Sequence, residues 1–431
     1  MSVKVNARSL KLAVVGGGWA GLAAAARATE AGHRVTLLEM AGQLGGRARG
    51  VDVDGLALDN GQHILIGAYR RTLALMALLG VNAGEVLDRR PLELRYPDGR
   101  GLALPRGPAW LAFGRAVWGC QGWTPADRWA LLRTASMWAW HGFTCDPRWT
   151  VDQLCAHLPQ SVRELLIDPL CVAALNTPAA EASAMVLLRV LRDALFGGAG
   201  AADLLLPRRS LAALLPEPAA RWLRQAGAEL RLHRRVQLIA KSEGGWQVDG
   251  AAFDAVVLAS SALEAARLAQ PLAPAWADQA RALRYEPIVT VYLRCPGGRL
   301  PAPMTALVQG AQEPAQFAFD HGALGGAAGI FAFVVSGARV WVEAGLDATA
   351  AAVQQQAQSC FAPGIWPQPP VLLRVMAEKR ATFACTPGLA RPAATIAPGL
   401  VAAGDYVDGP YPATLEGAVR AGEAAVARLA A

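Results

Sequence analysis

Three glycines and one glutamate near the start of the chain have the residue types and the spacing that hold a dinucleotide. Gly16, Gly18 and Gly21 satisfy the pattern G-x-G-x-x-G, and Glu39 follows them. In this pattern the first glycine permits a tight turn, the second lets the backbone approach a pyrophosphate, and the third lets a helix pack against a strand. A carboxylate placed like that of Glu39 binds ribose hydroxyls. The pattern alone also occurs in glycine-rich turns without a ligand, so its flanking elements decide between the two interpretations.

The flanking sequence provides the elements that this chemistry needs. Residues 11–15 form a short apolar run before the glycines, alanine-rich sequence follows them, and 35–38 form a second apolar run that ends at Glu39. That order predicts a strand, a turn, a helix, a second strand and an acid. Trp19 and Ala20 lie at the start of the helix, whose free N–H groups and positive dipole end face the phosphates. The sequence therefore predicts a dinucleotide-binding βαβ unit.

The composition places the chain among folded proteins that are large enough for two domains. It has 431 residues, of which 53% are hydrophobic and 17% are charged. No stretch of about 18 residues is apolar throughout without glycine, proline or charge, so we expect no transmembrane helix. Lys4, Arg8 and Lys11 precede an apolar stretch and mimic a secretory signal. Because the glycine pattern lies inside that stretch, we interpret it as part of the mature protein.

Cysteines, histidines and charges exclude several classes of site. The seven cysteines are scattered, odd in number and never spaced C-x-x-C, which indicates reduced thiols in a cytosolic protein. The six histidines show no metal-ligand spacing, so we predict no metal. The net charge of +7 comes mainly from arginine and reflects either genomic composition or attraction to an anionic membrane. No basic run is interleaved with aromatic residues, so we expect no nucleic-acid partner.

Patterning of the α/β type occurs three times along the chain, at 10–40, 203–259 and 399–431. A mostly helical segment, 108–197, and a strand-rich segment, 281–345, separate these stretches. The alternation predicts an α/β nucleotide-binding domain assembled from three segments, and a second domain of mixed α+β character. We assign the first domain to 1–85, 203–275 and 390–431, and the second to 86–202 and 276–389.

Several local signals predict elements within these segments. Residues 236–240 and 246–248 are expected to be the two strands of a hairpin that turns at Gly244 and Gly245. Residues 340–344 are expected to form another strand. Capping boxes predict helix starts at Thr124, Thr150 and Ser161.

Tryptophans are concentrated in a predicted helical insert, 108–149, which holds seven of the thirteen in the chain. They are Trp110, Trp118, Trp123, Trp129, Trp138, Trp140 and Trp149. Two interpretations stay open. In the first, the rings pack in the protein core. In the second, a pair of interfacial helices dips into a bilayer, where Arg115, Arg128 and Arg133 meet lipid headgroups.

Four separate segments together resemble the flavin-dependent amine oxidase and phytoene desaturase superfamily. The first is the glycine pattern with Glu39, and the second is the GGR element at 44–47. The third is the strand pair around Val236 with the buried strand that ends at Ala259. The fourth is Gly404 and Asp405 with residues 412–418, which open the last helix. The resemblance implies a Rossmann-like FAD domain of the glutathione-reductase type and favours FAD over NAD, because a simple dehydrogenase has no use for the second and fourth segments.

The resemblance also implies roles for individual residues toward FAD. Around the pyrophosphate, ribose and adenine these are Gly16, Gly18, Trp19, Ala20, Gly21, Glu39 and Val236. Along the phosphate, ribityl and flavin regions they are Gly46, Arg47, Gly61, Gln62, His63, Gly404, Asp405 and Leu415. The helix that begins near Leu415 aims its N–H groups at flavin O2, which stabilises negative charge on the reduced ring. Covalent relatives carry a cysteine in the loop at 403–406, where this chain has none, so non-covalent FAD is expected.

Within the superfamily the chain resembles the hydroxysqualene dehydroxylases, squalene-associated flavoproteins of bacterial hopanoid synthesis. Residues 59–69, 168–178 and 411–418 carry this resemblance. It implies reduction of hydroxysqualene to squalene: a hydride moves from reduced flavin N5 to an allylic carbon, and the hydroxyl leaves as water. It further implies an apolar C30 terpenoid substrate, a cytoplasmic protein held peripherally at the inner membrane, and upstream enzymes of the squalene pathway as partners.

The proton donor for the leaving oxygen cannot be assigned from the sequence. His63 is either that acid or a residue that shapes the loop beside the flavin. Asp168, Asn176 and Thr177 are candidates for the pocket only. Alternative functions are a phytoene or carotenoid desaturase with hydride flowing into oxidised FAD, an amine oxidase, and a non-catalytic flavoprotein scaffold.

Overall fold

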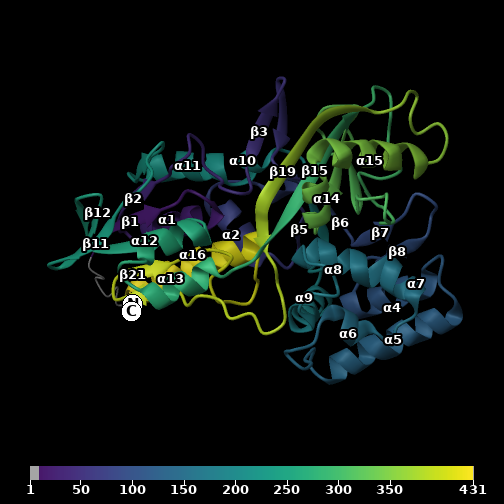
Figure 1. Cartoon of the computed structure of the whole chain (residues 1–431), viewed down its shortest axis with the longest axis horizontal. Coiled ribbons are helices and arrows are strands. Elements are labelled where there is room, and N and C mark those ends of the chain that lie inside the picture. The colour runs from purple at the N-terminus through teal and green to yellow at the C-terminus, as the bar shows by residue number, and fades with distance from the viewer. Residues whose placement is uncertain (1–8, 431) are drawn as a thin grey trace.

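The computed structural model describes residues 9–430 and is drawn in Figure 1. Lys4 and Arg8, two of the residues that mimic a secretory signal, lie outside the described residues. Within the described part of the chain, no helix combines the length and the apolar character needed to cross a bilayer. The fold is α/β, with a mainly parallel sheet at one end and, at the other, an antiparallel sheet and a group of helices.

The mainly parallel sheet draws its strands from three distant parts of the sequence. Its order is β10-β2-β1-β14-β21-β20, and β20 alone runs antiparallel to its neighbour. The bounds are β1 Lys11–Val15, β2 Arg34–Leu38, β10 Glu229–Arg231, β14 Ala255–Leu258, β20 Thr395–Ala397 and β21 Leu400–Ala402. Apolar runs covered on both faces are typical of parallel strands, which explains the continuous burial of β14 and β21.

Helices from both ends of the chain cover this sheet. α1, Trp19–Glu30, packs against α16, Leu415–Ala430 (Figure 1). Alanines on α1 and Gly422 on α16 let the two backbones approach, because a Cβ at Gly422 would clash with the carbonyl oxygen of Ala20. The other helices here are α2 Arg70–Leu78, α10 Leu211–Leu214, α11 Pro216–Gln225, α12 Ala262–Ala269 and α13 Pro274–Arg281.

The second sheet is antiparallel, in the order β16-β17-β18-β15-β19. Its strands are β15 Tyr285–Arg294, β16 Met304–Ala306, β17 Phe317–Asp320, β18 Ile330–Val335 and β19 Val371–Phe383. Helices α14, Arg339–Ala344, and α15, Leu346–Ser359, pack against it. The prediction of a strand at 340–344 is therefore wrong. Its β-branched and aromatic residues favour a strand, but the contacts of α14 with β15 and α15 override that propensity.

The predicted helical segment forms a lobe of its own, at the lower right of Figure 1. It contains α4 Ala109–Gly119, α5 Pro125–Trp140, α6 Val151–Cys155, α7 Gln160–Val162, a π-helical turn at Arg163–Ile167, α8 Asp168–Leu175 and α9 Ala184–Phe196. The capping boxes at Thr124 and Thr150 are confirmed. The one at Ser161 is wrong, because α7 begins after Pro159 and Ser161 lies inside the helix.

Small sheets and α3 complete the fold. Two sheets have two strands each: β3 Gly50–Val53 with β4 Leu56–Asp59, and β7 Glu93–Arg95 with β8 Gly101–Ala103. Two sheets have three strands each: β5 Leu65–Ile66, β9 Leu204–Pro207 and β6 Leu87–Arg90 form one, and β11 Ile239–Ser242, β12 Gly245–Val248 and β13 Ala251–Phe253 form the other. Helix α3 is Ala83–Val86. The predicted hairpin is present, but its first strand begins at Ile239, and residues 236–238 are irregular. The domain boundaries given above stay a prediction.

Candidate active site

One cavity of about 420 Å³ is lined by residues of the glycine turn at one end and of the antiparallel sheet at the other. Fourteen of the fifteen predicted cofactor residues line it: Gly16, Gly18, Trp19, Ala20, Glu39, Gly46, Arg47, Gly61, Gln62, His63, Val236, Gly404, Asp405 and Leu415. The exception is Gly21. A Cβ there would clash with the carbonyl oxygen of Gly16, so this glycine allows α1 to pack against the turn rather than facing the cavity.

The glycine turn leaves the start of α1 open toward the cavity. Gly16 has φ +113°, and a Cβ there would lie 2.5 Å from the carbonyl oxygen of Ala259, so only glycine fits. Gly18 is the N-cap of α1 and offers no side chain to its first N–H groups, and the first turn carries no acid. These N–H groups therefore stay available for an anion, as they do in dinucleotide-binding helices.

Glu39 ties the end of β2 to the glycine turn. One carboxylate oxygen accepts the N–H of Gly17 at 2.7 Å, and the other accepts the N–H of Ala41 at 2.7 Å. The side chain is buried, at 8% exposure, and lines the cavity. Each carboxylate oxygen has a second lone pair, so the group can also accept hydrogen bonds from ribose hydroxyls.

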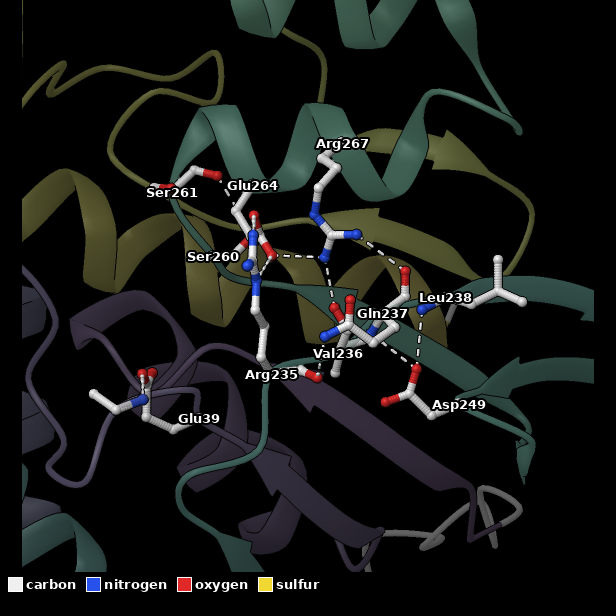
Figure 2. A network of polar contacts seen from close by, with 11 residues as sticks. Glu39, Arg235, Val236, Gln237, Leu238, Asp249, Ser260, Ser261, Glu264 and Arg267 are labelled. Carbon is white, nitrogen blue, oxygen red and sulfur yellow. Dashed lines mark hydrogen bonds and ion pairs between the residues drawn. The ribbon is translucent and has the colours of Figure 1, made fainter.

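A network of charged side chains holds the irregular segment that contains Val236 (Figure 2). The guanidinium of Arg267 donates to the carbonyl oxygens of Val236, at 2.5 Å, and Gln237, at 3.0 Å. Glu264 binds Arg267 at 2.6 Å and Arg235 at 3.1 Å. The bonds to Arg267 and Arg235 outweigh burial and lower the pKa of Glu264 to about 2, so it is an anion at neutral pH.

This network explains how Val236 can present backbone groups to a ligand although it lies outside any strand. On the far side of the segment, one oxygen of Asp249 accepts the N–H groups of Gln237 and Leu238, each at 2.9 Å. Sequence reasoning missed Glu264, Arg267 and Asp249. The acid at Glu264, three residues after Ser261 at the start of α12, was the available signal.

The GGR element packs directly on the glycine turn. Gly45 donates its N–H to the Gly17 carbonyl at 2.9 Å, and a Cβ on Gly46 would lie 3.2 Å from the Cα of Gly18. Arg47 forms an ion pair with Asp405 and donates to the Ala381 carbonyl at 3.0 Å. Burial would lower the pKa of Arg47, but the Asp405 carboxylate outweighs it and the pKa is raised. Arg47 and Asp405, both predicted to contact the cofactor, thus pair with each other, and Arg47 links the N-terminal segment to the C-terminal segment and to β19.

The loop after β4 contributes Gly61, Gln62 and His63 to the cavity wall. His63 Nδ1 lies 2.8 Å from the Gly61 carbonyl oxygen. Burial lowers the pKa of His63, and the nearby Arg47 lowers it further, which outweighs the contribution of the Gly61 carbonyl. A neutral ring whose Nδ1–H is donated to Gly61 leaves Nε2 as an acceptor. His63 therefore shapes this loop and is poorly suited to donate a proton.

At the start of α16, the chain directs further N–H groups at the cavity. Ala413, Thr414 and Leu415 line it. Thr414 accepts the N–H of Gly417 at 2.9 Å and so caps the helix. Glu416 is fully buried behind this turn and accepts the N–H and the hydroxyl of Thr72, at 2.9 and 2.8 Å, which fixes α16 against α2. The sequence offered no sign of the Glu416 contact.

The other end of the cavity is apolar, with a small polar cluster. Its apolar wall consists of Val172, Ala173, Ala174, Leu175, Ile288, Phe317, Phe319 and Val334. Asn176, which follows α8 with φ +47°, donates to the hydroxyl of Thr382 at 2.9 Å and to the Glu286 carbonyl at 3.2 Å. Its amide oxygen accepts the N–H of Gly337 at 2.7 Å. Asn176 thus has no free polar atom, whereas the Thr382 hydroxyl, used as an acceptor, keeps its own proton to donate.

The remaining pocket candidates lie elsewhere. Asp168 and Thr177 are not among the residues that line the cavity. Thr177 is fully buried, donates to the Leu175 carbonyl at 2.9 Å and accepts the N–H of Cys385 at 3.2 Å. Asp168 is the first residue of α8, four residues before the first lining residue of that helix, Val172. In contrast, sequence reasoning missed Thr382, which lies 206 residues from Asn176.

The cavity fits FAD in its polar as well as its steric features. The side-chain oxygen Oε1 of Gln62 is buried on its wall and has no hydrogen-bond partner among the described residues. The start of α1 has no side-chain cap and can bind an anion, and the glycines leave room for one. None of the described residues that line the cavity is a cysteine, and all seven cysteines are free thiols. Across residues 9–430 no three histidines, cysteines or acids gather as a metal site would require.

Comparisons with known proteins agree with this site. The family model of flavin containing amine oxidoreductases matches residues 19–430. A hydroxysqualene dehydroxylase of Rhodopseudomonas palustris is 30% identical over 96% of each chain, and one of Sinorhizobium fredii is 27% identical over 96% of each chain. A hydroxyneurosporene desaturase of Rhodobacter capsulatus is 42% identical, but over only 21% of this chain and 19% of its own.

Solved structures show the same fold at low sequence identity. A putative protoporphyrinogen oxidase from Exiguobacterium has a TM-score of 0.69 with 18% identity, covering 98% of this chain and 99% of its own. The cyclohexylamine oxidase from Brevibacterium oxydans has a TM-score of 0.70 with 16% identity and the same coverage. The FAD-binding α/β fold predicted from the sequence is confirmed.

Proposed function

The chain belongs to the flavin containing amine oxidoreductases and, among them, to the hydroxysqualene dehydroxylase family, and from this premise we propose that it reduces hydroxysqualene to squalene for hopanoid synthesis. It is an FAD-dependent oxidoreductase. Relatives over nearly the full length of the chain carry the dehydroxylase name, which supports this reaction.

The single observation that carries the proposal is the continuity of the cavity. The same cavity is lined by the residues predicted to hold the dinucleotide and by an apolar wall with aromatic rings at Phe317 and Phe319. An apolar wall suits a C30 hydrocarbon, and it keeps water away from an allylic carbon as positive charge develops there. Glu378, which pairs in register with Ile288, also lines the cavity, so the near full-length similarity to dehydroxylases, rather than the lining, argues against an amine substrate.

The reaction breaks a carbon–oxygen bond and forms a carbon–hydrogen bond at the same carbon. Bound reduced FAD supplies the hydride. The chain's own part is to hold the hydroxyl and to stabilise the negative charge that develops on the leaving oxygen. Thr382 suits this role, because its oxygen already accepts from Asn176 and its proton is left to donate into the cavity. The leaving oxygen departs as water once it has gained a proton.

The main alternative is a carotenoid desaturase, which would use the same apolar wall with oxidised flavin. The similarity to hydroxyneurosporene desaturase over part of the chain favours it. The apolar wall itself does not set the direction of hydride transfer, because an apolar surface suits hydroxysqualene and a conjugated polyene alike. The redox state that turns over, and the substrate, therefore distinguish the two functions.

The test is turnover by the purified holoenzyme without oxygen. The protein with its flavin reduced is incubated with hydroxysqualene, and products are identified by gas chromatography and mass spectrometry. We expect squalene, with one flavin oxidised for each molecule formed. Desaturation of a polyene by the oxidised enzyme would support the alternative instead. Tight FAD with turnover of neither substrate would indicate the non-catalytic scaffold and would overturn the proposal.

A further inference from the structure

Large apolar side chains lie exposed on one continuous surface of the helical lobe. On α4 the exposed residues include Trp110, Leu111 and Trp118, and on α5 they include Trp129, Met137 and Trp140. Trp129 is 62% exposed and Trp140 is 88% exposed. We call these six residues the tryptophan face. Of the two interpretations that the sequence left open, core packing holds for Trp123 and Trp138, which are buried, but not for the tryptophans of this face.

The tryptophan face is a single surface because the exposed sides of the two helices meet. On α5, Trp129, Met137 and Trp140 recur at helical spacing, while Leu131 and Trp138 on its other side are buried. The ring of Trp129 packs edge-on against that of Trp118 on α4, with centroids 6.0 Å apart. Helix α5 thus carries apolar side chains on its outer as well as its inner side, and a surface helix of that kind indicates an interaction site.

The charge around the tryptophan face is positive. Exposed Arg115 lies between Leu111 and Trp118 on α4, and exposed Arg133 lies between Trp129 and Met137 on α5. Residues 101–150 contain five arginines and two acids. Those acids are engaged elsewhere: Asp127 caps α5 through Thr124, and Asp146 pairs with Arg148. The arginines among the rings are therefore uncompensated, and this favours an anionic partner.

We infer that the tryptophan face binds the anionic surface of a lipid membrane. Tryptophans with arginines among them suit the boundary between acyl chains and headgroups, where the rings enter the apolar layer and the guanidinium groups meet phosphates. Binding of this kind is peripheral and needs no membrane-spanning helix, and the described residues contain none. Aromatic residues, methionine and arginine are also enriched in protein interfaces, so a second protein is the competing occupant, and the vesicle experiment below distinguishes the two.

The location of the tryptophan face relates it to the cavity. Helix α8, which lines the apolar end of the cavity, packs on α9, and α9 packs on α4. The mainly parallel sheet lies at the far end of the molecule (Figure 1). Membrane binding at α4 and α5 would therefore bring the apolar end of the cavity toward the lipid. Membrane binding itself does not depend on the proposed reaction, but its use, collecting a C30 lipid, rests on the proposed function.

The test is co-sedimentation of the holoenzyme with vesicles. One set is phosphatidylcholine alone, and the other contains about one third phosphatidylglycerol. The variant Trp110→Ser with Trp140→Ser removes two exposed rings that form no hydrogen bond or ring–ring contact with any residue of the described part of the chain. A second variant, Arg115→Glu with Arg133→Glu, reverses the charge. The matched control is Val340→Ser on α14, which removes an apolar side chain of intermediate exposure, 71% against 60% for Trp110 and 88% for Trp140, from another surface.

We expect the wild type and Val340→Ser to bind the anionic vesicles with equal affinity and the neutral vesicles more weakly. Both paired variants should bind at least about tenfold more weakly to the anionic vesicles, with unchanged FAD content. Equal binding by wild type and the tryptophan variant would overturn the inference. So would a wild-type dimer that the tryptophan variant converts to a monomer without loss of vesicle binding, because the face would then join two copies.

A second measurement separates this inference from the proposed reaction. Turnover of hydroxysqualene dissolved in detergent micelles needs no vesicle. Loss of vesicle binding in the paired variants with normal turnover in micelles supports the membrane role. Vesicle binding that depends on the tryptophan face, in a protein that does not convert hydroxysqualene, would leave the membrane role standing and remove the proposed reaction.

Discussion

The side-chain amide of Asn176 donates a hydrogen bond of 2.9 Å to the hydroxyl of Thr382, although 206 residues separate the two. This contact takes up a lone pair of the hydroxyl and leaves its proton free to donate at the apolar end of the cavity. Asn176 is itself held by Glu286 and Gly337, so the donor is pre-oriented before any substrate binds.

Replacing Thr382 with valine removes this donor while keeping the side chain's shape. We expect kcat to fall about 10- to 100-fold, because one hydrogen bond to a charged oxygen contributes about 1.5–3 kcal/mol. FAD content should not change. The serine variant keeps the hydroxyl and should retain most of the activity. A valine variant with wild-type kcat would show that Thr382 only packs against Asn176.

Replacing Glu39 with glutamine should weaken FAD binding. Each carboxylate oxygen of Glu39 accepts one N–H group, from Gly17 or from Ala41, whereas the amide of glutamine has one oxygen and must turn its NH2 toward one of these donors. The neutral amide also binds ribose hydroxyls less strongly than a carboxylate does. We expect the dissociation constant, measured by quenching of FAD fluorescence, to rise about tenfold or more. The control is Glu30→Gln at the exposed end of α1, which should bind FAD like the wild type. Equal affinities for the Glu39 variant and the wild type would argue against the ribose role.

Replacing Gly21 with alanine should destabilise the protein by about 3 kcal/mol or more. The new Cβ would clash with the carbonyl group of Gly16, which is backbone and cannot shift out of the way. Gly114 on α4 is the matched control, since a Cβ there has no atom within 4 Å. Alanine at Gly114 should raise stability by up to about 1 kcal/mol through helix propensity. Thermal unfolding checks both changes. Similar melting temperatures for the two variants would contradict the close packing at the turn.

The stability of the protein should fall as pH rises toward neutrality because of Asp59. Burial raises the pKa of its carboxyl from 3.8 to about 7, and the N–H of Leu211 only partly offsets this. Between these two values the folded protein binds more protons than the unfolded chain does, so stability decreases with rising pH and levels off above about 7. The loss has an upper limit of roughly 4 kcal/mol.

The variant Asp59→Asn cannot ionise and keeps an oxygen for the N–H of Leu211. Urea unfolding at pH 5 and pH 8 should therefore show a smaller pH-dependent loss for this variant than for the wild type, with the variant the more stable at the higher pH. Parallel losses in the two proteins would mean that other groups dominate the pH dependence.

Denaturing the purified protein with acid should release all of its flavin. No described residue that lines the cavity is a cysteine, so the thioether attachment seen in covalent relatives has no side chain to form it. After centrifugation we expect yellow colour and FAD fluorescence in the supernatant only. Flavin that stays with the precipitate and remains fluorescent on a denaturing gel would show a covalent bond.

Local pattern predicted the nucleotide end of the protein well, because each signal lies within a few residues of the structure it specifies. The spacing of Gly16 and Gly18 after an apolar run produces the turn that the structure shows, and Glu39 directly follows the next strand. The strand predicted at 340–344 failed because β-branched residues favour a strand only while no packing partner selects a helix. Neither Thr382 nor Glu416 could be identified, since their partners lie hundreds of residues away.

The sequence by itself determined that a dinucleotide cradle forms and which acid accompanies it, because a tight turn, an open helix end and a carboxylate follow from residue types at short spacing. Only the tertiary structure decided which side of the tryptophan-rich helices meets water and which polar side chains face the apolar end of the cavity. Exposure and contact depend on which helices and strands pack together, and the free energy of that packing is distributed over residues far apart in the chain.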